Sequence, residues 1–165
     1  MKNPLVLALS LCIACTLCAG TLHALDELYV GLGLELNSNS QENPAVAAGG
    51  NLSAGLKLDE LFDVGIKIGF SHDFNELGVL ELQGLFRYQL PVSISGLFVQ
   101  AEMGVAILFY ESNSYPAFIG GIAAGWRIFP GGDKWYLEPT IRIGYPFIWS
   151  VGITFGIPIS IKGEE

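Results

Sequence analysis

The sequence predicts an all-β protein, an eight-stranded antiparallel up-and-down transmembrane β-barrel. Three observations support this fold class. First, apolar residues alternate with small or polar ones at a period of two, in eight successive runs. Second, most runs have about 9–13 residues, close to the 9–11 that a tilted strand needs to cross a bilayer. Third, one face of the runs carries no charge, whereas the other face is rich in glycine.

The composition limits what the chain can be. Its 165 residues suffice for one domain or at most two small ones, and 51% of them are hydrophobic while 15% are charged. A chain this apolar is not disordered. It is also a poor nucleic-acid binder, because phosphate contacts need clustered Lys and Arg, and this chain has a net charge of −8. The 21 glycines are unusual in such an apolar chain.

The first 24 residues have the pattern of a secretory signal peptide. Met1-Lys2-Asn3 is short and basic, residues 4–17 are apolar and uncharged, and small or mildly polar residues follow up to Ala24. A lipoprotein signal or a buried N-terminal helix fits this pattern less well. We expect residues 25–165 to form a single barrel domain without cysteine, hence without disulfides. The cysteines inside the leader are Cys12, Cys15 and Cys18.

Short connections rich in turn residues separate the expected strands, which permits a meander without helices. The strands are expected at residues 28–37, 46–58, 64–73, 79–88, 97–109, 118–128, 135–145 and 149–161. The connections are expected at residues 38–44, 75–76, 91–96, 111–116 and 130–133, with a very tight turn at 145–148.

Residues 143–161 offer a competing interpretation, because 19 uncharged residues are long enough for a transmembrane helix. They contain Pro146, Pro158 and three glycines, and apolar residues alternate strictly with small or polar ones from Trp149 onward. We therefore expect a strand. Pro139 and Pro158 lie inside expected strands, and each removes a ladder hydrogen bond, so we expect bulges or local breaks there.

The uncharged face is expected to point outward. An eight-stranded barrel has an interior just wide enough for side chains to fill, and the bulky apolar side chains of this face are too many to fit there. The other face, with ten charges and twelve glycines, suits a narrow interior. The outward face then forms the apolar band that a membrane barrel presents to lipid. The sheet must close, because unpaired strand edges do not occur in hydrocarbon.

The inward face is expected to hold a lumen charge network. Five acidic and five basic residues fall on it, which suits pairing, since buried charges are tolerated when they are paired and hydrogen-bonded. We expect structural ion pairs in preference to a solute-binding site. The residues are Glu35, Lys57, Lys67, Asp73, Glu81, Arg87, Glu102, Arg127, Glu138 and Arg142.

Aromatic residues are expected to form two girdles at the membrane interfaces. The first strand is expected to begin in the periplasm, so odd-numbered strands run outward and even-numbered strands return. The outer girdle then comprises Phe70, Phe109, Phe118, Tyr145 and Trp149. The inner girdle comprises Tyr88, Trp126 and Trp135.

These features resemble the small eight-stranded outer-membrane barrels of Gram-negative-type bacteria, the OmpA/OmpX/OmpW-like group. The resemblance covers residues 28–161 and rests on architecture without a specific motif, so it transfers no functional residue. It implies a porin-like barrel in the bacterial outer membrane, with outer-membrane lipid and the barrel-assembly machinery as partners. Such proteins usually end on an aromatic residue that this machinery reads, whereas this chain continues after Ile161 as Lys162-Gly163-Glu164-Glu165.

The sequence offers little catalytic chemistry. Outside the leader the single histidine is His72, and alternation places Ser71 and Asp73 on the opposite face, which argues against a triad. Glycine-rich stretches lie inside expected strands, without the helix that follows a phosphate loop. The acidic turn at 59–63 is expected to be solvated, weak cation binding being the alternative. We expect no catalytic residue, no cofactor and no metal.

The predicted function is a structural role or the passage of small solutes through a narrow lumen. One alternative is a soluble, lipocalin-like barrel that binds an apolar ligand. A weaker one is a lipid-modifying barrel enzyme that uses a lipid-facing His72. The expected outer connections are short, which argues against a large receptor surface or a protruding adhesive sheet. The sequence identifies no solute, surface partner or oligomeric state.

Overall fold

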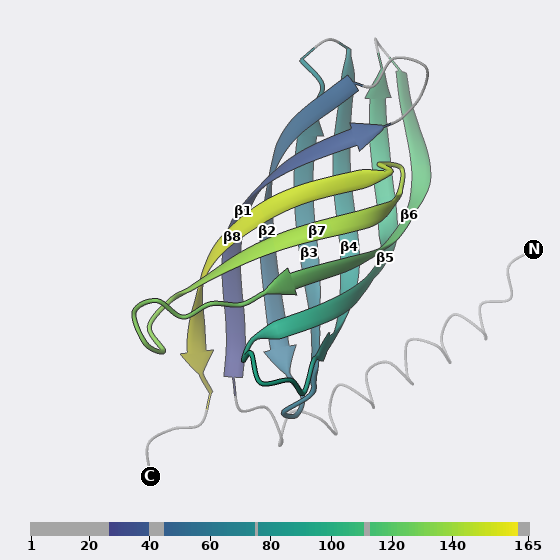
Figure 1. Ribbon diagram of the computed structural model, residues 1–165. Coiled ribbons are helices and arrows are strands. Elements are labelled where there is room, and N and C mark those ends of the chain that lie inside the picture. Colours follow the sequence, from purple (N-terminus) through teal and green to yellow (C-terminus); the bar gives the residue numbers. More distant parts are fainter. Residues whose placement is uncertain (1–26, 40–44, 75, 111–112, 162–165) are drawn as a thin grey trace, which may run out of the picture.

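The computed structural model describes residues 27–39, 45–74, 76–110 and 113–161, which form a closed antiparallel barrel (Figure 1). Each strand pairs with the next along the chain, and β8 pairs with β1 to close the sheet. The strands are β1 (Glu27–Asn39), β2 (Ala45–Lys57), β3 (Phe62–His72), β4 (Leu77–Gln89), β5 (Leu97–Tyr110), β6 (Asn113–Trp126), β7 (Tyr136–Tyr145) and β8 (Trp149–Ser160). The expected signal peptide and its cysteines lie outside the described residues.

The predicted meander is confirmed, and its strand boundaries agree with the sequence within two residues except at the start of β6. The turn expected at 111–116 is wrong, because β5 runs to Tyr110 and β6 begins at Asn113. Pro116 therefore lies inside β6, opposite Ile107 of β5. It is tolerated because this part of β6 has no partner on the β7 side among the described residues, so no ladder bond is lost there. The described residues include no helix that is long and apolar enough to cross a membrane.

The two prolines in β7 and β8 differ in their effect. Pro139 stands opposite Trp126 in the register shared by β6 and β7, and the ladder is interrupted there as expected. Ile128 and Leu137, two positions away, exchange both backbone hydrogen bonds. Every second pair of an antiparallel ladder does so, and Pro139 has no N–H to donate. At Pro158 the expected bulge or break is wrong, because the register with β1 continues unbroken.

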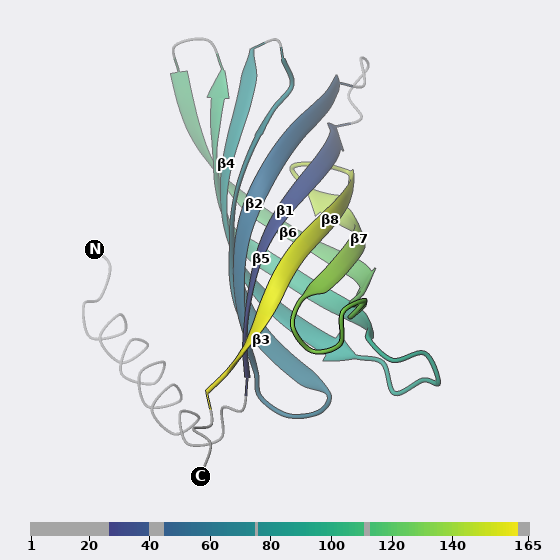
Figure 2. The same cartoon turned by 90° about the vertical axis from the view of Figure 1, so that its left-hand side faces the viewer.

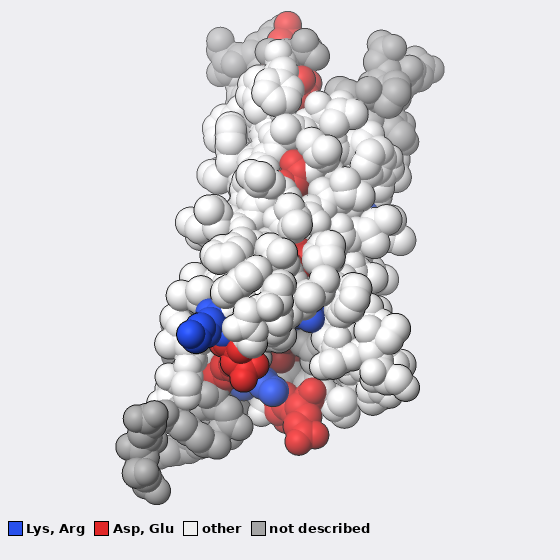
Figure 3. All heavy atoms as spheres, turned by 60° about the vertical axis from the view of Figure 1, so that its left-hand side comes forward, with Lys and Arg blue, Asp and Glu red and all other residues white. Residues whose placement is uncertain are grey.

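The strands present their predicted faces. In β1, Leu32 and Leu34 point outward with 62% and 67% of their surface exposed, whereas Tyr29 and Asn37 are buried. Each of the eight strands contributes exposed large hydrophobic residues. Figure 3 shows a broad and largely uncharged surface, with charged residues gathered mainly at the lower end and some acidic atoms visible along the face and at the upper end. A soluble barrel would need the reverse arrangement, with its apolar face inside.

The two ends of the barrel differ. We call the end where β1 begins and β8 ends the proximal end, and the opposite end the distal end. At the distal end the β7–β8 hairpin stops short, because Tyr145 at the end of β7 pairs with Gly120 of β6 (Figure 2). Within the described chain, residues 113–119 of β6 therefore pair with β5 alone. These strands therefore extend beyond the β7–β8 hairpin although their connections are short. That no adhesive sheet protrudes stays a prediction.

Candidate functional site

Glycines on the inner face make room for large side chains in the lumen. Gly156 of β8 lies against the ring of Tyr136, and Gly125 of β6 lies against the ring of Phe98. A Cβ atom at either position would collide with the ring beside it. Tyr136 and Phe98 are almost completely buried. The inward glycines therefore leave space that aromatic side chains occupy, which fills the proximal half of the barrel.

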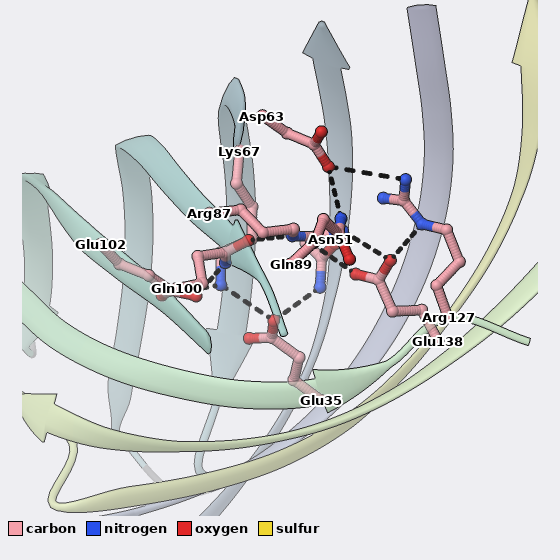
Figure 4. A network of polar contacts seen from close by, with 10 residues as sticks. All are labelled: Glu35, Asn51, Asp63, Lys67, Arg87, Gln89, Gln100, Glu102, Arg127 and Glu138. Carbon is pink, nitrogen blue, oxygen red and sulfur yellow. Dashed lines mark hydrogen bonds and ion pairs between the residues drawn. The ribbon is translucent and has the colours of Figure 1, made fainter. Parts of the chain in front are cut away.

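The inward charges form two clusters that share a hydrogen-bonded link (Figure 4). The proximal cluster centres on Glu138 of β7. Its carboxylate accepts hydrogen bonds of 2.9 Å and 2.7 Å from Arg87 Nη1 and Nη2, and a third of 2.9 Å from Arg127 Nε. Asp63 lies 3.8 Å from Arg127 Nη1 and accepts a 2.8 Å bond from Gln89. Two buried arginines and two buried carboxylates thus neutralise one another.

Both arginines of the proximal cluster also lie over aromatic rings. Arg87 Cζ is 3.7 Å from the ring centre of Phe98, and Arg127 Cζ is 3.9 Å from that of Tyr29 and 4.6 Å from that of Tyr136. A guanidinium over an aromatic face is attracted by the ring quadrupole. These stacks hold the guanidinium planes in place, so the proximal cluster braces opposite walls of the barrel.

The central cluster lies nearer the distal end and centres on Glu102 of β5. Lys67 Nζ is 3.3 Å from Glu102 and 3.2 Å from Glu35. Arg142 Nε is 3.2 Å from Glu102, and Arg142 Nη1 is 3.7 Å from Glu81. These residues come from β1, β3, β4, β5 and β7, so the cluster joins walls that no backbone ladder connects directly.

Uncharged amide side chains complete the network. Gln100 accepts a 2.9 Å bond from Arg87 Nε and donates a 2.8 Å bond to Glu102, which links the two clusters. Asn51 and Gln83 each donate a 2.7 Å bond to a carboxylate of the central cluster. Sorting the inward face by charge alone does not pick out these uncharged residues. Their position on that face was the available signal.

Eight of the ten residues predicted for the charge network lie in these clusters. Lys57 belongs to neither cluster. It lies at the proximal mouth and makes no ion pair within the described part of the chain. Asp73 does not join either, because its Oδ1 accepts backbone bonds from Glu76 and Leu77 and shapes the β3–β4 turn. Asp63, assigned from sequence to a solvated turn, is instead buried in the proximal cluster.

Open space is found in the proximal half of the lumen. A cavity of about 30 Å³ lies beside the proximal cluster, which is room for about two water molecules. A vestibule of about 420 Å³ lies at the proximal mouth. Tyr29, Asp63 and Arg127 line both spaces and so mark the boundary between them. The proximal mouth is therefore open, and the lumen narrows at the proximal cluster.

The distal end of the lumen holds an apolar cluster that the sequence analysis did not predict. Its centre is Phe147, which is 3% exposed although it belongs to the β7–β8 connection. The partly buried side chains of Leu77 and Leu108 pack against this cluster. We call its buried members the apolar plug: Ala47, Val79, Ala106, Ile119 and Phe147. Four strands and one turn supply them, so no single stretch of sequence reveals the plug.

His72 has a structural environment. Its Nδ1 accepts a 2.8 Å hydrogen bond from the backbone N–H of Phe74, and the two rings meet edge to face at 6.2 Å. Phe74 has a φ of 64°, a left-handed conformation that most side chains avoid, and this bond stabilises it. Among the described residues, no group of three or more His, Cys, Asp or Glu is placed to hold a metal ion.

The aromatic residues predicted for the two girdles lie toward opposite ends of the strands. The distal set is Phe70, Phe109, Phe118, Tyr145 and Trp149, which are 39–67% exposed. The proximal set is Tyr88, Trp126 and Trp135. Trp126 donates a 2.9 Å bond to the Ser95 carbonyl, and Trp135 stacks on Phe155 at 5.5 Å. That the two sets lie at membrane interfaces stays a prediction.

Comparison with known proteins shows a likeness in structure. No protein-family model matches the sequence, and no curated protein is significantly similar to it. The crystal structure of Neisserial surface protein A superposes with a TM-score of 0.60 at 11% identity, covering 81% of this chain and 97% of that one. The N-terminal β-barrel domain of Pseudomonas aeruginosa OprF gives 0.53 at 14% identity, covering 82% and 98%.

A third solved structure is similar, with a slightly lower TM-score. Ail, the attachment invasion locus protein of Yersinia pestis, gives a TM-score of 0.51 at 10% identity, covering 82% of this chain and 97% of that one. Sequence identities this low establish a shared fold and nothing finer. The chain thus has the eight-stranded barrel fold of the small outer-membrane proteins, as the sequence predicted.

Proposed function

We propose that this chain is an integral outer-membrane protein of a Gram-negative-type bacterium, with a structural role and a lumen closed to solutes. The uncharged outer surface supports the membrane location, since lipid tolerates apolar side chains outside a closed sheet and no unpaired edge. Its similarity in fold to three outer-membrane barrels supports the same location. Phase separation in detergent tests it: recovery in the aqueous phase without aggregation would favour the soluble alternative.

The observation that carries the closed lumen is that side chains fill it at two levels. The ion network joins opposite walls from Asp63 to Glu81, and the apolar plug closes the distal end. The cavity beside the proximal cluster measures only about 30 Å³. A solute-conducting pore needs a continuous water-filled channel, which larger barrels have and filled eight-stranded barrels lack. A structural role therefore fits this lumen better than solute passage.

Planar-bilayer recording tests the closed lumen. The detergent-refolded protein is added to the bilayer, and a wide bacterial porin in the same bilayer shows that insertion and detection work. We expect small or no conductance from this protein. Stable, large single-channel currents would contradict the closed lumen and revive the narrow-passage interpretation.

The orientation follows from the expected signal peptide. The proximal end would face the periplasm, and the distal end, with the protruding part of β6, would face the cell exterior. The barrel-assembly machinery would insert the protein into the outer membrane. We assign no catalytic step to the protein itself. A protease site inserted between Tyr110 and Asn113 should be cleaved in intact cells if this orientation holds. Cleavage only after the outer membrane is broken would show that the distal end faces the periplasm, the opposite of the proposed orientation.

A further inference from the structure

Several buried polar atoms at one level of the lumen lack a hydrogen-bond partner among the described residues. Asn37 Oδ1, Ser71 Oγ, Glu81 Oε1, Gln83 Oε1 and Ser150 Oγ have no hydrogen bond from any described residue. Two nitrogens of one arginine, Arg142 Nε and Nη1, also lack hydrogen bonds, although both lie within ion-pair distance of carboxylates. The residues that carry these atoms are all at most 4% exposed. Buried polar atoms normally have a partner, from protein or from ordered water.

These atoms belong to one place in the barrel. Ser150 of β8 pairs with Asn37 of β1 on one side and with Arg142 of β7 on the other. Arg142 Nη1 reaches to within 3.7 Å of Glu81 on β4, so it spans the lumen between the two walls. Gln83 is bonded to the same Glu81 carboxylate at 2.7 Å. The unpartnered atoms thus surround a single level of the lumen, at the distal side of the central cluster.

One glycine leaves room at this level. Gly69 stands opposite Glu81, and a Cβ atom there would lie 3.5 Å from Asn51 Cβ and 3.9 Å from Glu81 Oε2, without a collision. At Gly49 and Gly104 a Cβ atom would collide with the neighbouring strand, so these two glycines allow close packing and leave no space. The lining therefore combines polar atoms with the side-chain volume left open at Gly69, which are the two conditions that a buried water site needs.

We infer that this level of the lumen is a water-binding site, and that the apolar plug is the barrier that separates its water from the distal side. Water suits the lining because it can both donate and accept. A cation would satisfy the oxygens but face Arg142, and an anion would face Glu81. A buried water makes about three hydrogen bonds, so seven unpartnered atoms call for about two or three waters.

The plug adjoins this level of the lumen directly. Asn37 pairs with Ala47 and Ser71 pairs with Val79, and both partners are plug residues. Narrow apolar constrictions block water and ions because water does not wet them. Phe147 is the largest plug residue and lies in a connection, so shortening it changes no strand. The inference rests on the proposed closed lumen and assigns the closure to this cluster.

Proton flux into liposomes that contain the refolded protein and a trapped pH-sensitive dye tests the barrier. We expect the unaltered protein to match empty liposomes, and Phe147→Ala to raise the flux at least about tenfold, equivalent to about 1.4 kcal/mol of barrier. The matched control is Phe74→Ala, at the same end of the barrel but 76% exposed. It should leave the flux unchanged. If Phe147→Ala does not fold, Val79→Thr replaces it, since threonine keeps the shape and adds a hydroxyl to the plug.

The outcomes separate this inference from the proposed function. A leak through the unaltered protein would overturn the closed lumen. A tight unaltered barrel with folded Phe147→Ala and Val79→Thr variants that leak no more than Phe74→Ala would overturn the plug as the barrier. The water site has its own readout, nuclear Overhauser contacts between long-lived water and the side-chain amides of Asn37 and Gln83. Their absence in the unaltered protein would overturn the water site.

Discussion

Replacing Glu138 by glutamine tests whether the proximal cluster is as buried and as tightly coupled as its geometry indicates. The glutamate accepts three hydrogen bonds of 2.7–2.9 Å from Arg87 and Arg127, and it is 5% exposed. Glutamine keeps the volume and one acceptor but removes the charge. Two guanidinium groups are then left with the Asp63 carboxylate alone, at 3.8 Å from Arg127.

The expected loss of unfolding free energy is about 3–5 kcal/mol, the usual cost of removing one partner from a buried ion pair. Two features favour the lower part of this range. Arg87 keeps its bond to Gln100, and both arginines keep their aromatic stacks. The loss measures the cost of an uncompensated buried charge. It does not measure the net value of the pair, since apolar replacement of a whole buried cluster is often neutral.

Urea unfolding of the barrel refolded into lipid vesicles provides the assay, with the fluorescence of Trp126, Trp135 and Trp149 as the signal. The matched control is Glu76→Gln in the exposed β3–β4 connection, which should change the unfolding free energy by less than about 0.5 kcal/mol. If Glu138→Gln were as mild as this control, the cluster would be solvated and the argument from burial would be wrong.

Two further substitutions test the inner and outer faces in the same vesicle assay. Gly156→Ala should cost about 1–3 kcal/mol, because the new Cβ collides with the ring of Tyr136. Its control, Gly50→Ala, places a Cβ 3.4 Å from the nearest atom and should be much milder; equal effects would refute the packing argument. Leu34→Arg should cost about 2–4 kcal/mol, because its outward, 67% exposed side chain would face lipid. A negligible cost would mean that water covers this face.

Alternation along each strand made the fold predictable. A period of two assigns every residue to a face of its strand. The interior of an eight-stranded barrel is too narrow for one face's bulky, uncharged side chains, so that face must point outward. Alternation along β3 also assigns Asp63 to the inward face, where the structure places it. The charge network predicted from the sequence left Asp63 out, because it was assigned to a turn. Pro116 misled the assignment of β6, because a proline on an unpaired strand edge looks in sequence like part of a turn.

Contacts across the lumen could not be predicted in the same way. Lys67 and Glu102 are 35 residues apart and on strands that are not neighbours, so their meeting depends on the stagger of all strands between them. The height of each residue in the barrel depends on that stagger as well. Four strands bring plug residues to one level, and Phe147 comes from a turn without periodicity. No local pattern could therefore have indicated the plug.

The stability of this barrel and its closure to protons should therefore depend on different residues. Charged groups hold water, so the ion network braces the walls without by itself excluding water from the lumen. Apolar side chains exclude water but contribute no cross-links between walls. Glu138→Gln should thus weaken the barrel and leave it closed to protons, whereas Phe147→Ala should open it to protons. Liposome flux and urea unfolding measured on both variants decide this: if Glu138→Gln leaked more than Phe147→Ala, the network would be the barrier and the plug a packing feature.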